Sequence, residues 1–140
     1  MRRWHHRASR SGIATIECLI CLPVLLTITF GTIELCAAMF LKETLTIAAY
    51  EGARVGVQSG GTDAEAISRI EQVLDERGIV YDGSAITFSS PSFNSAATLD
   101  MVTVTIEVDC SSNLPITGGN FFTGQSLSAS IVMRKEFANP

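Results

Sequence analysis

The feature that most constrains this chain is a long apolar stretch, SGIATIECLICLPVLLTITFGTIELC, which runs from Ser11 to Cys36. Its uncharged run, residues 18–33, would form a helix about 24 Å long at the α-helical rise. The apolar residues on either side extend this helix beyond the roughly 30 Å that a bilayer core requires. The sequence therefore predicts a single membrane-spanning helix over residues 13–41.

The charges beside this helix predict its orientation and limit its partners. Residues 1–12 carry four arginines and no acid, and positive flanks stay in the cytoplasm. We therefore expect a basic cytoplasmic leader, residues 1–12, and an extracytoplasmic C-terminal part. Loss of the leader would leave six basic residues against fourteen acids, changing the formal charge from −4 to −8. A product this acidic is not expected to bind nucleic acid.

The composition of the extracytoplasmic part argues against an enzyme. Both histidines, His5 and His6, precede the membrane helix, and only one cysteine, Cys110, follows it. Without a histidine, this part lacks the usual Ser-His, Cys-His and His-metal sites. We therefore expect no catalytic residue, no metal, no cofactor and no small-molecule substrate. A single cysteine also excludes an internal disulfide there.

Residues 13 to about 58 are predicted to form one helix, whose extracytoplasmic continuation, residues 42–58, is amphipathic. In this continuation Ala48, Gly52 and Gly56 recur every four residues. Small side chains on one helix face let another backbone approach closely, so we expect a helix or a strand to pack there. Alternatively, the two glycines only weaken the end of the helix.

A second helix is predicted over residues 63–77. Thr62 and Glu65 have the spacing of a capping box, which satisfies the first N–H groups of a helix. Gly78 supplies a C-terminal stop. The apolar stripe of this helix consists of Ile67, Ile70 and Leu74.

The rest of the chain predicts strands. A short one is expected over residues 85–89, and apolar and polar residues alternate over 101–109 and 126–136. The residues expected on the apolar face are Val102, Val104, Ile106 and Val108, then Leu127, Ala129, Ile131 and Met133. Residues 59–140 thus predict a small extracytoplasmic domain, and the fold class is α+β, membrane-anchored, with a long N-terminal helix, a second helix and an antiparallel sheet of about three strands.

The apolar stretch carries two acids that a bilayer disfavours. An acid near the bilayer centre costs about 2.5–3.5 kcal/mol on insertion scales, so such residues usually have a partner or a purpose. Glu17 lies four residues, about one helical turn, after Ile13. A cut between Gly12 and Ile13 would create an α-amine at about the depth of Glu17, and the two charges could neutralise each other.

A glycine followed five residues later by glutamate, behind a basic leader and ahead of an apolar helix, resembles a type IV prepilin processing site. The resemblance implies a prepilin peptidase that cuts after Gly12 on the cytoplasmic side. It also implies assembly with other pilin-like subunits, in which Glu17 meets the amine of a neighbour.

A narrower resemblance covers RSGIATIECLICLPVLLTITFGTIELCAAMFLKETLTIAAYEGARVGV, which is similar to the TadE family of minor pseudopilins of the tight-adherence (Tad/Flp) pilus. The matching features, in order, are Gly12, Glu17, Leu22-Pro23, Gly31 with Glu34, and YEGARVGV. The resemblance implies a pilus assembly component of the bacterial inner membrane, with pseudopilins, pilus assembly proteins and the lipid bilayer as partners. Cys18 departs from the pattern, since this system commonly has an aromatic residue after the glutamate.

Three further residues of the helix leave alternatives open. Glu34 lies near the outer membrane interface, where it is either hydrated or in contact with a partner helix. Pro23 and Gly31 loosen the helix, either as a tolerated kink or as a means to bend during extraction from lipid.

The functional alternatives are a processed pseudopilin and an uncleaved single-pass protein. In the second case, the extracytoplasmic domain would be a module that binds a protein or a surface.

Overall fold

The computed structural model describes residues 11–115, 122 and 124–136. In chain order, its elements are α1 (Ser11–Val57), α2 (Asp63–Glu76), β1 (Ile86–Phe88), β2 (Met101–Asp109), α3 (Cys110–Asn113) and β3 (Ser126–Arg134). The strands form one antiparallel sheet in the order β1-β2-β3. The structure confirms the predicted fold class, and it adds the short helix α3. The basic leader, up to residue 10, lies outside the described residues.

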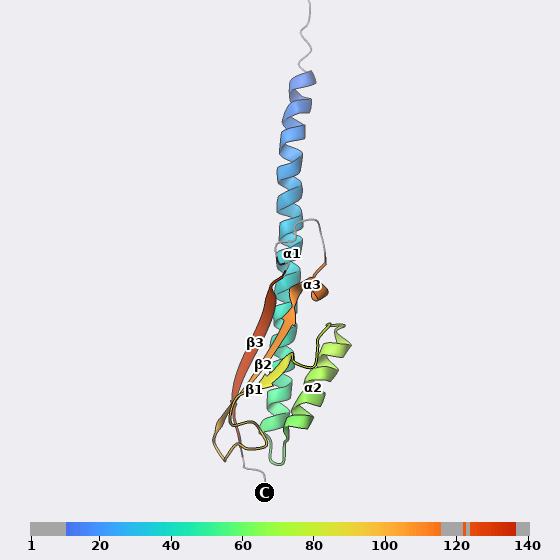
Figure 1. Cartoon of the computed structure of the whole chain (residues 1–140). Coiled ribbons are helices and arrows are strands. Elements are labelled where there is room, and N and C mark those ends of the chain that lie inside the picture. Colours follow the sequence, from blue (N-terminus) through green and yellow to red (C-terminus); the bar gives the residue numbers. More distant parts are fainter. Residues whose placement is uncertain (1–10, 116–121, 123, 137–140) are drawn as a thin grey trace, which may run out of the picture.

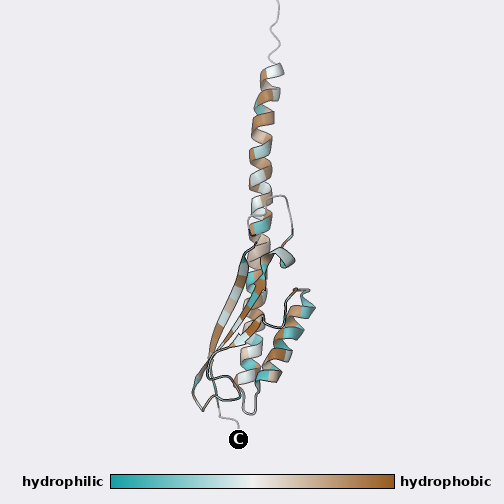
Figure 2. Cartoon of the chain, viewed as in Figure 1, coloured by the Kyte–Doolittle hydropathy of each residue, from teal (hydrophilic) through white to brown (hydrophobic). Residues whose placement is uncertain are grey.

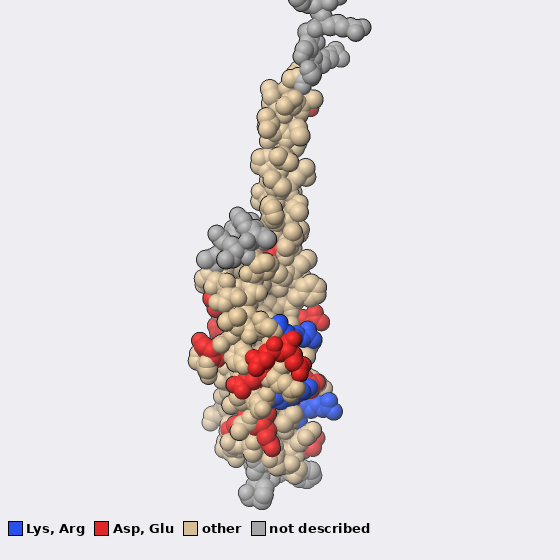
Figure 3. Space-filling view, turned by 90° about the vertical axis from the view of Figure 1, so that its right-hand side faces the viewer, with Lys and Arg blue, Asp and Glu red and all other residues tan. Residues whose placement is uncertain are grey.

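The first half of α1 projects far beyond the rest of the molecule (Figure 1). Every residue from 12 to 33 except Gly31 is exposed, and burial begins at Glu34. Residues 12–33 span about 33 Å at the α-helical rise, close to the roughly 30 Å of a bilayer core. Strongly apolar residues recur along this part, while charged side chains gather on the folded end (Figures 2 and 3). Among the described residues, α1 is the one helix long and apolar enough to cross a membrane.

The second half of α1 runs through the centre of the folded domain. It packs against α2 on one side and against β3 and β2 on the other (Figure 1). Its most deeply buried apolar residues are Leu41, Leu45, Ala48, Ala49 and Ala53. The core of the domain is therefore built on the same helix that carries the membrane segment.

The sheet covers this core with its apolar face. The four predicted inward residues of β2, Val102, Val104, Ile106 and Val108, are all buried. In β3 the predicted inward residues are less exposed than the residues between them, and Ala129 is buried. Because the antiparallel register pairs Ile106 with Ala129, the apolar positions of the two strands lie on one face.

α2 begins as predicted, and its capping box is confirmed. The Thr62 hydroxyl accepts a hydrogen bond from the Glu65 N–H at 3.2 Å, and the Thr62 N–H donates to the Glu65 carboxylate at 3.1 Å. The helix ends at Glu76, one residue earlier than predicted, ahead of Gly78 with its φ of +65°. Ile67 of the predicted stripe is only half-buried. The buried residues are Ala66, Ile70, Val73 and Leu74.

Other parts of the chain approach α1 closely at its two predicted packing glycines. A Cβ added to Gly52 would lie 2.3 Å from Cγ1 of Ile70 in α2, and one added to Gly56 would lie 2.6 Å from the ring of Phe93. Ala48, one turn earlier, is fully buried. The glycines therefore leave the space that Ile70 and Phe93 fill.

A buried lysine holds the C-terminal end of α1. The Lys135 side chain is 0% exposed, and its ammonium donates hydrogen bonds to the carbonyls of Gly56 and Gly61, each at 2.8 Å, and of Gln58 at 3.5 Å. A cation at this end complements the helix dipole. Burial lowers the pKa of Lys135, while the nearby carboxylates of Asp63 and Glu65 act in the opposite direction.

The position of Lys135 explains why β3 is shorter than predicted. The expected strand, 126–136, ends at Arg134, and bonding toward the β2 side continues for one residue beyond it. The Lys135 N–H donates to the Asp100 carbonyl, and the Glu136 N–H donates to the Val57 carbonyl of α1. The end of the strand is thus used to close the end of the helix.

A second lysine joins β3 to α1 nearer the membrane segment. The Lys42 ammonium of α1 donates to the Ser128 carbonyl of β3. Lys42 and Gly56 lie about 21 Å apart along α1, and Ser128 and Lys135 lie about 23 Å apart along an extended chain. Because these lengths match, β3 runs beside α1 and in the same direction.

We predict that Gly56→Ala lowers the free energy of unfolding of the domain by about 1–3 kcal/mol, because the added methyl group would overlap the Phe93 ring. Gly83→Ala is the matched control, since no atom lies within 4 Å of its added Cβ. Thermal unfolding of the full chain in lipid nanodiscs measures both. Equal stability of the two variants would contradict the close approach of Phe93 to α1.

We also predict that Lys135→Met lowers the free energy of unfolding by about 2–4 kcal/mol, because it removes the ammonium that donates to the buried Gly56 carbonyl at the end of α1. Arg134→Met, at the exposed neighbouring position, should change it by no more than about 0.5 kcal/mol. Denaturant titration of the full chain, followed by tyrosine fluorescence, measures the difference. A Lys135→Met protein as stable as the wild type would show that the ammonium contributes nothing to this helix end.

Candidate functional site

The predicted processing site lies at the very start of the described helix. Gly12 is the second residue of α1, and it is exposed. No atom lies within 4 Å of a Cβ built on it. Glycine also weakens a helix by about 1 kcal/mol relative to alanine. The backbone on either side of the Gly12–Ile13 bond is therefore accessible and easy to unwind, as a protease substrate must be.

Glu17 is an exposed acid on an exposed apolar helix. Its neighbours Ile13 and Ile16 are 62% and 59% exposed. The Glu17 carboxylate forms neither a hydrogen bond nor an ion pair with a described residue. Residues four apart lie on the same helix face, with Cβ atoms about 5–6 Å from each other. An amine at Ile13 would thus be within reach of the Glu17 carboxylate.

Glu34 has a different environment. It is 5% exposed, and its Oε2 atom is buried without a hydrogen-bond partner. This burial argues against the hydrated alternative for Glu34. Both that alternative and contact with a partner helix stay predictions. The two acids lie roughly 25 Å apart along α1, so one is positioned to act in the bilayer and the other at the domain.

The two loosening residues do not interrupt α1. The helix is continuous through Pro23 and Gly31, and Figure 1 shows no sharp bend in its projecting half. The Thr27 hydroxyl donates to the Pro23 carbonyl one turn earlier, at 2.8 Å, a side-chain bond that threonine commonly forms within a helix. Bending during extraction stays a prediction.

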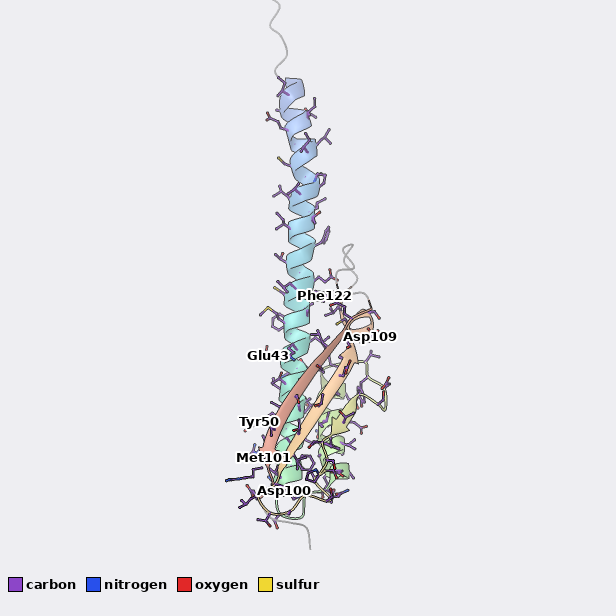
Figure 4. The ribbon with its side chains drawn as sticks, turned by 60° about the vertical axis from the view of Figure 1, so that its left-hand side comes forward. Glu43, Tyr50, Asp100, Met101, Asp109 and Phe122 are labelled. Carbon is purple, nitrogen blue, oxygen red and sulfur yellow. The ribbon has the colours of Figure 1, made fainter. Side chains whose placement is uncertain are left out.

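An apolar groove lies where α1 leaves the predicted membrane segment, and sequence analysis did not find it. It has a volume of about 780 Å³. The α1 residues that line it include Leu35, Met39 and Ile47. Phe122, from the segment before β3, and Leu127, from β3 itself, line its other side. Figure 4 shows Phe122 beside α1. In the sequence, Phe122 lies in a Gly-rich connector. The pair of adjacent phenylalanines at 121 and 122 was the signal from which an apolar contact of this connector could have been predicted.

The cysteines and acids form no further site in the described part of the chain. Cys18, Cys21 and Cys36 are exposed on α1, Cys110 is buried, and all four are free thiols. Burial raises the pKa of the Cys110 thiol, which makes it a poorer nucleophile. Over residues 11–115, 122 and 124–136, no three His, Cys, Asp or Glu side chains come together as they would around a metal ion.

The fold and this site define a class of protein, a small α+β domain built on a long helix whose apolar half is suited to a membrane and carries a pilin-like glycine and glutamate. A family model described as TadE-like protein matches residues 12–54, which confirms the resemblance to the TadE-like family. The match covers most of α1, and it indicates a function associated with the Tad pilus. Comparison with curated proteins gave no match, and comparison with solved structures gave none.

Proposed function

We propose that this chain is a TadE-like minor pseudopilin that is processed after Gly12 and acts in biogenesis of a Tad/Flp-type adhesion pilus. One observation carries the proposal. Glu17 is a carboxylate without a partner among the described residues, on an exposed apolar helix, one turn from an accessible Gly12–Ile13 bond. The family match over residues 12–54 supports the same assignment.

The proposed chemistry has two steps. A prepilin peptidase hydrolyses the Gly12–Ile13 peptide bond, which leaves a carboxylate on the leader and an ammonium group at Ile13. Glu17 of the same or a neighbouring subunit then neutralises that ammonium within lipid, where an unpaired charge is unfavourable. Pairing with a neighbour would favour association of the helices. Cleavage would thereby convert an anchored precursor into an assembly-competent subunit.

The proposed location is the bacterial inner membrane, with the N-terminus in the cytoplasm and the folded domain outside. The basic leader supports this orientation. The prepilin peptidase, other pseudopilins, pilus assembly proteins and the bilayer are the proposed partners. The domain is proposed to have no enzymatic activity, and thus to act through contacts.

The second candidate is an uncleaved single-pass protein whose extracytoplasmic domain binds a protein or a surface. The apolar groove beside α1 favours it, because a groove of about 780 Å³ is large enough to receive side chains of a partner. Cys18, in place of the aromatic residue expected after Glu17, also favours it.

Mass spectrometry of the protein extracted from membranes distinguishes the two candidates. We expect the mature chain to begin at Ile13 in cells that contain the prepilin peptidase, and at the initial methionine in cells that lack it. An intact chain in both strains would support the uncleaved anchor.

Replacement of Glu17 tests the second step. Glu17→Val should leave membrane insertion unchanged or improved, since it removes a charge from the apolar helix. Recovery of other Tad proteins with the tagged chain should fall by about tenfold or more, which corresponds to about 1.4 kcal/mol. Glu43→Val, on the exposed surface of α1 outside the predicted span, is the control. Unchanged recovery with Glu17→Val would remove the role proposed for this acid.

A further inference from the structure

β3 is an edge strand of the sheet, with β2 on one side only. The Cys110 N–H donates to the Gln125 carbonyl and the Lys135 N–H donates to the Asp100 carbonyl. In the register of the β2–β3 pair, alternate residues of an edge strand point their N–H and C=O groups toward the neighbouring strand. The odd-numbered residues of β3 therefore pair with β2. The backbone groups that point away from the sheet belong to Ser126, Ser128, Ser130, Val132 and Arg134.

Only one end of this edge is covered within the described structure. The Lys42 ammonium binds the outward carbonyl of Ser128, and a lysine is one of the usual means of blocking an edge strand. No bond from a described residue is recorded for the outward backbone groups of Ser130, Val132 and Arg134. This half of β3 has no proline, glycine or bulge that would prevent another strand from pairing with it.

The Ser130 hydroxyl is hydrogen-bonded to that of Thr105 at 2.9 Å, but other side chains around the open half lack partners among the described residues. Val132 is 58% exposed, and Met101, near it on the outer face of β2, is 61% exposed. Figure 4 shows Met101 at the end of the sheet that lies far from the projecting half of α1. Arg134 is exposed and forms no ion pair with a described residue. A row of unpaired backbone groups, an apolar patch and a free guanidinium therefore occur together.

We infer that the open half of β3, from Ser130 to Arg134, receives an extended segment of another pilus protein as a fourth strand of the sheet. The occupant follows from the chemistry, because alternating N–H and C=O groups match the backbone of a strand. That strand would place apolar side chains beside Val132 and Met101 and a carboxylate opposite Arg134. The inference rests on the proposed function, which supplies the partner proteins.

A second copy of this chain fits the edge less well. Two copies anchored in one membrane have α1 in the same direction, and β3 runs parallel to α1. Their β3 strands could then pair only in parallel, and an in-register pair would bring together the two Arg134 side chains and the two Lys42 side chains. Like charges directly opposite each other destabilise a strand pair.

Residue-resolved amide hydrogen exchange tests the inference on the full chain. The tagged protein is purified from cells that contain the Tad proteins, together with those that accompany it, and alone from cells that lack them. In the isolated chain the amides of Ser130, Val132 and Arg134 should exchange fast, while those of Ala129, Ile131 and Met133 are protected. In the complex, exchange of the first three should slow by at least about tenfold.

Val132→Pro and Ser126→Pro form a matched pair of variants. Neither removes an N–H that bonds β2, because both residues point outward at the edge, and proline is tolerated at such positions. Val132→Pro should abolish the partner-dependent protection of Ser130 and Arg134, and Ser126→Pro, at the end covered by Lys42, should keep it. Should Val132→Pro fail to fold, the comparison of the wild-type chain alone and in complex still decides.

Three results would overturn the inference. The first is a complex in which the outward amides exchange as fast as in the isolated chain, which leaves the proposed function intact. The second is protection of these amides in the isolated chain that rises with its concentration, which would identify a second copy as the occupant. The third is a chain that recovers no Tad protein at all, which would overturn the proposed function as well.

Discussion

The interaction on which the rest of the structure depends is the closure of the end of α1 by Lys135. The last carbonyls of a helix have no partner within it, and here they are buried under the domain. A single ammonium, from the residue that follows β3, binds the carbonyl of Gly56 in α1 and those of Gln58 and Gly61 just beyond the helix. Because Lys42 fixes the other end of β3 to α1, the strand and the helix are held in one register, and the sheet is placed over the buried face of the helix.

This arrangement divides α1 into two functional halves. The C-terminal half of α1 packs against both the sheet and α2. Gly52 and Gly56 provide the space that Ile70 of α2 and Phe93 fill. The projecting half is exposed on all sides, as expected of a helix whose natural surroundings are lipid or other helices. The two acids belong to different halves, since Glu17 is open to a partner and Glu34 is covered by the domain. The same helix can therefore link events in the membrane to a rigid domain outside it.

The free edge of β3 follows from the same construction. Lysine at position 135 ends the strand, and Lys42 covers the edge nearer the projecting half of α1, so in the described part of the chain the open stretch is Ser130 to Arg134. The sheet has β1 on its other side, where a strand of three residues offers little backbone. An added strand would thus lie far from the projecting half of α1. In the function proposed above, the apolar helix and the open edge would be two separate means of assembly.

The sequence by itself determined the elements and their faces. The capping box at Thr62, the alternation in β2 and the length of the apolar stretch are local patterns, and each was read without knowledge of the neighbours. Tertiary structure decided what these elements meet. Lys135 is buried although a lysine is expected at the surface, because the carbonyls of Gly56, Gln58 and Gly61 converge on its ammonium. The burial of Glu34 is likewise a result of long-range packing, which no local pattern encodes.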